Sequence, residues 1–424
     1  MGSTVIAIPD GEAVAPAAKD KKKFQESLRP AISFLGEMKN KHDMKKIIHS
    51  IKVGIALVLV SLLYLLDPLY KQVGENAMWA IMTVVVVFEF FAGATLSKGL
   101  NRGLGTILGG GLGCLAAAFA HEVGGVGNAV VVGTFVFIFG AAATHSRLDP
   151  RIKKRYDYGA MIFLLTFNLV VVSGIRVDEV LKLARERLTT IVMGFSACIF
   201  TSLLVFPIWA SDELHDSVAS KFEDLAGSIE GCFKVYFRLV NEKENQPSFT
   251  FSCCKSVLHS KSKDESLANF ARWEPWHGKF GFSHPWGKYL KIGENLRDVA
   301  ATILSFKGCL QSDRQFHQTS QTLRELIKEQ CEDVGSSLAW TLRELGDSIK
   351  KMRRCQTVTS IMPELKSMRQ ELSLVMSPSI LGQLENGDRL EIASFLFTLT
   401  VMVDQVEELT KEVEELGELA RFHV

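Results

Sequence analysis

Charged side chains in and beside long apolar runs are the part of this sequence most able to do chemistry. Lys52 and Glu89 lie inside such runs, and Lys98, Arg102 and Arg187 flank the ends of others. A charge in membrane hydrocarbon costs roughly 3 kcal/mol on insertion scales, so it usually faces a bundle interior or a water-filled path. Basic groups along such a path attract and partly dehydrate anions. The pattern therefore indicates passage of anions.

Each of these charges also has an interpretation that needs no function. Lys52 can pair with Glu89, or its long side chain can extend to the inner membrane interface. Lys98 and Arg102 can simply anchor their spans on the cytoplasmic side. A further group between the last two apolar runs mixes both signs: Arg176, Lys182, Arg185, Arg187, Asp178, Glu179 and Glu186. This group either pairs locally or forms a basic pore entrance.

Motifs of catalysis, metal binding and nucleotide binding do not occur in the sequence. His121-Glu122 lacks the second histidine of the HExxH motif, and there is no Gly-x-Ser-x-Gly or P-loop sequence. Gly105, Gly109 and Gly113 lie within an apolar run with no strand before it, so their spacing indicates close helix packing rather than a phosphate loop. We therefore predict no enzyme activity, no cofactor, no metal site and no nucleic-acid partner.

The elements that hold these residues follow from the distribution of apolar side chains. The average composition, with 47% hydrophobic and 22% charged residues and a formal net charge of +1, hides two different halves. A bilayer is crossed by about 20 mostly apolar residues. Six runs come close to that length, at residues 47–66, 77–96, 104–120, 126–144, 159–175 and 188–209.

Basic residues in alternate loops give the predicted orientation. They gather before the first run, between the second and third, and between the fourth and fifth, which places these loops and both termini in the cytosol. The prediction is an all-α membrane protein: residues 1–46 as a cytosolic segment, 47–210 as a six-span channel domain embedded in membrane lipid, and 211–424 as a cytosolic helical domain.

The charged half is predicted to fold as packed helices. Ser211 suits a helix start, because its hydroxyl can cap the first turn. A helix over about residues 389–422 has an apolar front that is too short to span a membrane, so we expect it in a buried core. Trp273, Glu274 and Pro275 begin a loop rich in aromatics and proline, which we expect to be fastened onto the helices rather than to bind a ligand.

Several separated motifs resemble those of one family. The stretch from Trp79 to Thr106 resembles the signature of the plant aluminium-activated malate transporter family. Further landmarks occur in the same order: Tyr156-Asp157-Tyr158-Gly159, Phe206-Pro207-Ile208-Trp209-Ala210 and Trp273-Glu274-Pro275. The resemblance runs from about Lys39 to the end of the chain.

This resemblance implies an anion channel with six spans, a helical cytosolic domain and a dimeric assembly. It implies pore-associated basic positions at Lys98, Arg102 and Arg187, and intramembrane charges at Lys52 and Glu89. It also implies transport of malate and inorganic anions such as chloride, nitrate and sulfate, mainly as efflux from the cytosol. As a whole, the sequence looks more like family members of the plasma membrane than like those of the vacuolar membrane.

Three functions from different classes are consistent with these residues. The leading prediction is a passive channel, with Arg187 toward the outside and Lys98 and Arg102 toward the inside, giving two separate rings of charge in a dimer. The alternatives are a proton-coupled organic-acid exporter that uses Glu89 as proton carrier, and a non-conducting membrane scaffold. The glycine face and the apolar cytosolic helices both predict a two-fold homodimer.

Overall fold

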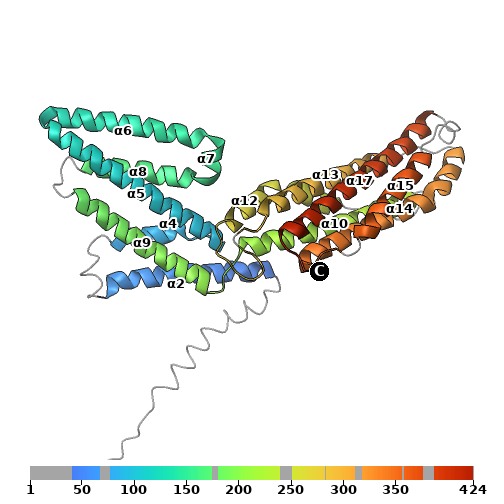
Figure 1. Ribbon diagram of the computed structural model, residues 1–424, viewed down its shortest axis with the longest axis horizontal. Helices are drawn as coiled ribbons and strands as arrows, with labels where there is room; N and C mark the ends of the chain where they lie inside the picture. Colours follow the sequence, from blue (N-terminus) through green and yellow to red (C-terminus); the bar gives the residue numbers. More distant parts are fainter. Residues whose placement is uncertain are drawn as a thin grey trace, which may run out of the picture.

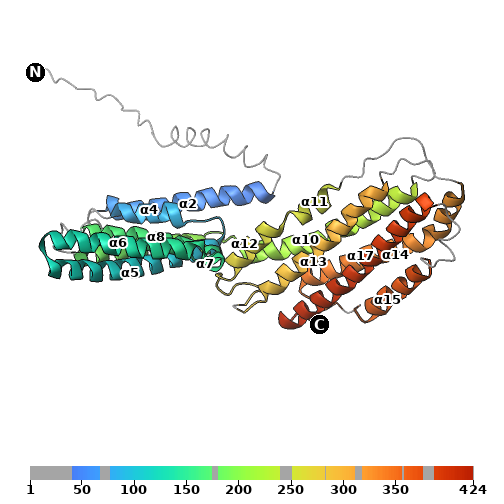
Figure 2. The same cartoon turned by 90° about the horizontal axis from the view of Figure 1, so that it is seen from above.

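The computed structural model describes residues 41–66, 77–173, 180–238, 251–281, 283–310, 318–355, 358–375 and 386–423. Over these residues the regular structure is helical, apart from two isolated bridges. Two helical bundles lie end to end along the long axis of the molecule (Figures 1 and 2). We call them the apolar half, α2 to α9, and the charged half, α10 to α17.

The apolar half contains the helices α2 (Lys41–Leu65), α4 (Ala77–Val87), α5 (Ala92–Val123), α6 (Gly125–Leu148), α7 (Pro150–Arg155), α8 (Asp157–Ser173) and α9 (Val180–Leu204). The charged half contains α10 (Ala210–Arg238), α11 (Ser252–Leu258), α12 (Lys261–Ala271), α13 (Trp286–Leu310), α14 (Gln318–Lys351), α15 (Val358–Val375) and α17 (Asn386–Leu419).

Three helices among the described residues are long and apolar enough to cross a membrane: Ala92–Val123, Gly125–Leu148 and Arg185–Leu204. Met78–Val87 and Asp157–Ser173 are apolar but shorter. In α6, Val132 alone is buried, while Val126 and Phe137 are 85% and 75% exposed. An apolar helix that buries so little must face lipid or another chain.

The second predicted span is wrong as a continuous helix, because it breaks at its Phe-Glu-Phe-Phe segment. The helix α4 ends at Val87 and α5 begins at Ala92, whose N–H donates to the carbonyl of Ile208 at 3.0 Å. The Thr95 hydroxyl bonds to the backbone N–H and carbonyl of Glu89, at 3.0 and 3.3 Å. Three of the backbone groups freed by the break are thus satisfied, two by the nearby Thr95 hydroxyl and one by a distant carbonyl. Lys98 and Arg102 consequently lie inside α5 rather than in a loop.

The glycine stripe of α5 lies against α8 of the same chain. A Cβ on Gly105 would meet the Gly159 carbonyl oxygen at 2.4 Å, and one on Gly109 would meet the Phe163 carbonyl oxygen at 2.7 Å. A Cβ on Gly113 would lie 3.0 Å from the Val170 side chain. The stripe allows the two backbones to approach closely. The expectation that it serves as a dimer face is therefore wrong, because α8 already covers it.

Alanine at Gly109 and at Gly111 should have opposite effects on stability. In Gly109→Ala the added methyl group pushes α5 away from α8, and this overpacking should destabilise the protein by about 1–3 kcal/mol. Gly111 is exposed with open space around its position, so Gly111→Ala should be neutral or stabilise by about 0.5–1 kcal/mol through helix propensity. Thermal unfolding of the purified protein in detergent measures both. Equal midpoints for the two variants would contradict the close packing.

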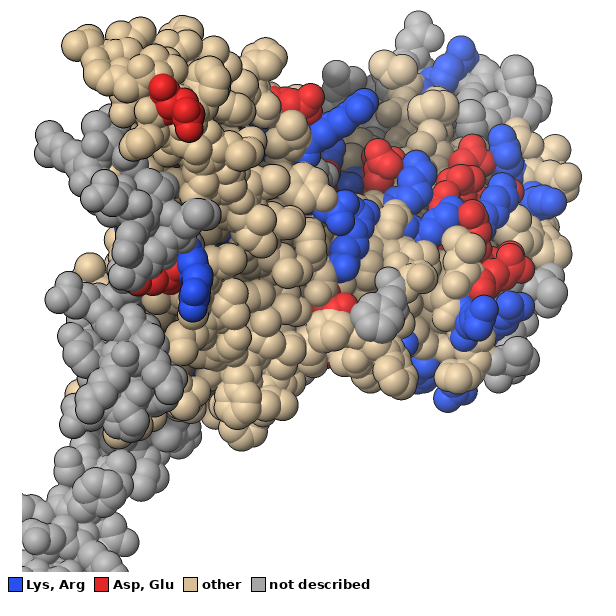
Figure 3. All heavy atoms as spheres, turned by 60° about the vertical axis from the view of Figure 1, so that its left-hand side comes forward, with Lys and Arg blue, Asp and Glu red and all other residues tan. Residues whose placement is uncertain are grey.

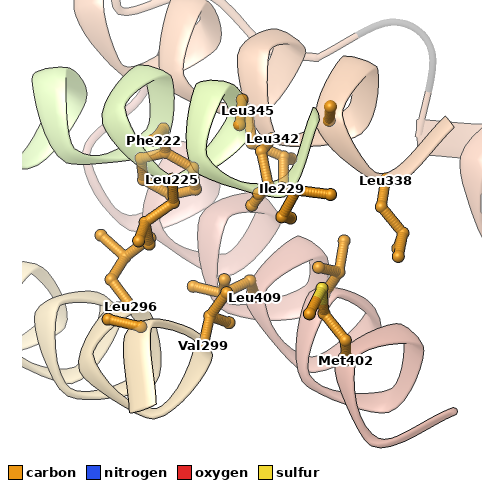
Figure 4. Packing of buried hydrophobic residues seen from close by; sticks show 14 of the residues in the cluster. Phe222, Leu225, Ile229, Leu296, Val299, Leu338, Leu342, Leu345, Met402 and Leu409 are labelled. Carbon is orange, nitrogen blue, oxygen red and sulfur yellow. The ribbon is translucent and has the colours of Figure 1, made fainter. Parts of the chain in front are cut away.

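One large hydrophobic core extends through the charged half, from Ala210 to Phe422. Figure 4 shows Phe222 and Leu225 of α10 facing residues of the other helices, among them Leu296 of α13 and Leu409 of α17. The prediction of a buried carboxy-terminal helix is confirmed, because Ile392, Phe395, Leu399 and Met402 are at most 1% exposed. Two smaller clusters lie in the apolar half.

Candidate anion pathway

The charged residues of the apolar half are brought together by α4, α5, α8 and α9. The long helix α5 packs against both α8 and α9, and α9 also packs against α4. Side chains from α5 therefore meet those of α8 on one side and those of α9 on the other. Close approach to α9 is possible because Gly99 leaves room for the Phe195 ring.

Glu89 pairs with Lys98, and the expected Lys52–Glu89 pair is wrong. The carboxylate of Glu89, in the break between α4 and α5, accepts a hydrogen bond from the Lys98 ammonium. Their side chains are 35% and 40% exposed. The break between α4 and α5 makes this pair possible, because Glu89 is not in a helix and can reach Lys98 on the second turn of α5.

Lys52 satisfies the carboxy-terminal end of α9. The residue is 1% exposed, and its ammonium donates to the carbonyls of Ser202 and Phe206 at 3.2 and 3.5 Å. The last carbonyls of a helix have no partner within the helix and carry a partial negative charge. A buried cation is stabilised there. Lys52 therefore joins α2 to α9 and does not pair with Glu89.

Arg102 and Lys98 share the side chain of Tyr158. The Arg102 guanidinium donates to the Tyr158 hydroxyl at 3.1 Å, and the Lys98 ammonium lies 5.9 Å from the centroid of the same ring. Arg102 is 7% exposed, and its Nε is buried without a hydrogen-bond partner. A buried guanidinium with an unused donor can bind an anion or a water molecule.

Arg187 lies flat against the ring of Trp79. Its guanidinium carbon is 3.4 Å from the ring centroid, a close cation–π contact, and its Nε is also buried without a partner. Arg102 and Arg187 lie on the packed helices α5 and α9. The expectation of two rings of charge at different levels stays a prediction. Arg176 lies outside the described residues.

Two aromatic residues of this site, Tyr158 and Trp79, were not predicted as site residues from the sequence. Tyr158 and Trp79 both lie in stretches quoted above for their family resemblance, but nothing in the spacing showed that they hold cations. A signal was available, because Tyr and Trp rings next to basic residues in membranes commonly hold them by cation–π contacts.

Tyr158→Phe should weaken the passage of divalent anions without loss of folding. The variant keeps the ring beside Lys98 but removes the hydroxyl that holds Arg102. A hydrogen bond to a charged group contributes about 1.5–3 kcal/mol to stability. We expect only part of this free energy to be lost specifically while an anion passes Arg102. We expect roughly a two- to fivefold lower malate current at equal surface abundance. A Tyr158→Phe current like the wild type would show that Arg102 is positioned by other contacts.

Trp273, Glu274 and Pro275 lie where the two halves meet. The Glu274 carboxylate accepts hydrogen bonds from the N–H groups of Ala210 and Ser211, at 2.6 and 3.2 Å, and from the Ser211 hydroxyl at 2.6 Å. The expected cap of this helix by Ser211 is therefore wrong: Glu274 caps α10 and Ser211 supports it. Pro275 accepts a hydrogen bond at its carbonyl from the ring of His277, at 2.8 Å.

The same loop contacts the apolar half. The Arg155 guanidinium lies 5.2 Å from the centroid of the Trp273 ring. A Cβ on Gly93 would collide with the Phe270 carbonyl oxygen at 2.2 Å and with the Glu274 side chain at 2.8 Å. The start of α5, next to Glu89 and Lys98, is thus packed directly on this loop.

Comparison with known proteins places the chain in a family. Residues 38–385 match the family described as aluminium activated malate transporter. Aluminum-activated malate transporter 12 of Arabidopsis thaliana is 48% identical over 316 residues, which cover 74% of this chain and 56% of the relative. Transporter 14 of the same plant is 43% identical over 355 residues, or 82% and 65%. Transporter 1 of Triticum aestivum is 35% identical over 402 residues, or 90% and 84%.

The chain spans only about two thirds or less of the length of these first two relatives. Within that part, the match takes in the apolar half, the junction loop and most of the charged half. The family is one of membrane transporters, not of enzymes. The chain is therefore a membrane protein that belongs to the aluminium-activated malate transporter family.

Proposed function

We propose that this chain is an anion channel that conducts malate and smaller inorganic anions. One observation carries the proposal: Arg102 and Arg187, on the packed helices α5 and α9, each have a buried Nε without a hydrogen-bond partner, and neither has an acidic partner among the described residues. Like charges in a low-dielectric interior are costly unless an anion or water lies between them. The names of the relatives, which are malate transporters, support malate as the substrate.

The membrane topology that we propose has six spans, with the charged half in the cytosol. It is supported by contacts that place the start of α2 beside the charged half: the Lys45 ammonium lies 2.7 Å from the Glu213 carboxylate. Burial raises the pKa of Glu213, but the hydrogen bonds and charges of Lys45 and Lys263 together outweigh burial and hold that pKa below its ordinary value. The basic helix α7 lies on the same side, through Arg155 and Trp273. Basic loops belong in the cytosol.

Two chains are proposed to form the channel. The apolar faces of α5 and α6 contain large exposed side chains, including Leu115, Phe119 and Phe137 at 57% to 75%. Such surface can be covered by lipid or by a second copy. In a homodimer each basic group occurs twice. A dianion is driven out of a negative cytosol by about 4.6 kcal/mol at 100 mV, so a passive pore in the plasma membrane is sufficient for efflux.

Reversal potentials in a voltage-clamped cell test this function. A channel should follow the Nernst potential of the anion when malate or chloride is changed on either side. An exporter that uses Glu89 as a proton carrier would instead shift its reversal potential with pH at fixed anion gradients. Absence of current from protein that reaches the surface would indicate a scaffold and would contradict the proposal.

A further inference from the structure

The groove between α5, α6 and α8 has the form of a lipid site. It has a volume of about 430 Å³, within the range of ligand sites. Its walls are apolar or small side chains: Leu104, Gly105, Leu108, Phe139, Ala142, Ala143, Ala160 and Phe163. Leu104 and Leu108 are 52% and 58% exposed, so the groove opens sideways from the apolar half. A chain of methylene groups suits such a surface.

The groove ends in polar groups beside α7. Asn101 of α5, Ser146 of α6 and Tyr156 line that end. Tyr156 directly follows α7 and has its N–H bonded to the Ile152 carbonyl. The Arg155 guanidinium lies 5.5 Å from the centroid of the Tyr156 ring. Tyr156 lines the groove, so this contact holds the Arg155 cation at the mouth of the groove.

The surface around this mouth is strongly basic. The segment from Arg147 to Asp157 contains five basic and two acidic residues. Both acidic groups are engaged: Asp157 pairs with Arg147 at 2.7 Å, and Asp149 caps α7 by accepting the Arg151 N–H. Arg151, Lys153 and Arg155 are exposed, and none has a carboxylate partner among the described residues. Figure 3 shows basic side chains gathered where the largely uncharged apolar half meets the charged half.

We propose that this groove binds one acyl chain of an anionic phospholipid, whose phosphate is held by Arg151, Lys153 and Arg155. The proposal rests on the membrane topology given above but not on conduction. Lipid tails are as apolar as the groove, so the acyl chain fits the groove but does not distinguish one phospholipid from another. The basic groups supply the selectivity, because each attracts an anionic headgroup. Three of them predict a preference of roughly tenfold or more for phosphatidylserine over phosphatidylcholine.

Native mass spectrometry of the full chain in detergent tests the site. The purified protein is titrated with phosphatidylserine or phosphatidylcholine of equal chain length, and with glycerophosphoserine, which has the headgroup but no acyl chains. Arg151→Gln/Lys153→Gln should bind phosphatidylserine roughly tenfold more weakly, and it should weaken phosphatidylcholine much less, because the choline cation offsets the charge of that phosphate. Lys261→Gln/Lys366→Gln removes two exposed charges of the cytosolic helices and should change neither. Glycerophosphoserine should bind poorly.

A second variant tests the groove itself. Ala143→Phe fills the groove and should reduce binding of both phospholipids while the basic surface stays intact. Unaltered lipid selectivity in Arg151→Gln/Lys153→Gln would overturn the proposal. It would also be overturned if Ala143→Phe left lipid binding unchanged and altered only the oligomeric state, because the groove would then be a subunit interface. Glycerophosphoserine binding as tight as the phospholipid would show a headgroup site without a chain.

Discussion

Neutralising Arg102 or Arg187 is expected to reduce malate current about tenfold and chloride current about threefold. Arg102→Gln and Arg187→Gln each remove one positive charge from the candidate pathway between α5 and α9. The interaction of an ion with a fixed charge scales with the charge of the ion, so a dianion loses twice the free energy that chloride loses. If malate loses about 1.4 kcal/mol, chloride loses about 0.7 kcal/mol, so the malate current falls about tenfold, the chloride current about threefold and the malate-to-chloride ratio about threefold. Recordings from cells with matched surface abundance measure this ratio.

Charge-conserving variants are the control for this experiment. Arg102→Lys and Arg187→Lys keep the charge but lose the flat guanidinium that contacts Tyr158 and Trp79. They should keep most of the malate-to-chloride ratio. Their currents should still fall, because a Lys ammonium cannot stack on an aromatic ring or donate several hydrogen bonds in one plane as a guanidinium does. If Arg102→Gln and Arg187→Gln kept the wild-type ratio at normal abundance, both arginines would be structural groups and the proposed pathway would be wrong.

Much of the helix content of this chain could be predicted from periodicity, but the break before α5 could not. Residues 77–96 are apolar throughout, and hydropathy cannot distinguish one span from two helices that meet at an angle. The break depends on partners far along the chain, namely the Ile208 carbonyl and the loop around Glu274. It also decides the pairing of Glu89, which is why Lys98 and not Lys52 is its partner.

The residue types of the site were visible in the sequence, whereas their partners were not. Lys52, Arg102 and Arg187 stand out because charges are costly in apolar runs. Their contacts depend on which helix faces which: α9 supplies carbonyls to Lys52, and α8 supplies Tyr158 to Arg102. Spacing along one helix carries no information on such neighbours. Glycine spacing gave the packing face of α5 but not the identity of the helix that covers it.

Glu274→Ala should strongly destabilise the charged half, although it removes no part of the hydrophobic core. The Glu274 side chain is 1% exposed and accepts three hydrogen bonds at the start of α10. Its loss leaves buried N–H groups without partners, at about 1–3 kcal/mol each, and removes a negative charge from the positive end of the helix. A total of about 3 kcal/mol corresponds to a fall of roughly 10 °C in unfolding temperature for a domain of this size.

The order of three variants distinguishes capping from mere burial. Glu274→Gln keeps one acceptor oxygen for Ala210 and should fall between the wild type and Glu274→Ala in thermal unfolding. Glu294, a surface carboxylate that pairs with Lys291, is the matched control, and Glu294→Ala should change stability by less than about 0.5 kcal/mol. Because Glu274 lies against Gly93 at the start of α5, its loss should also disturb the Glu89–Lys98 pair and lower the current that remains. A Glu274→Ala protein that unfolds at the wild-type temperature would show that α10 is capped by water or by Ser211 alone.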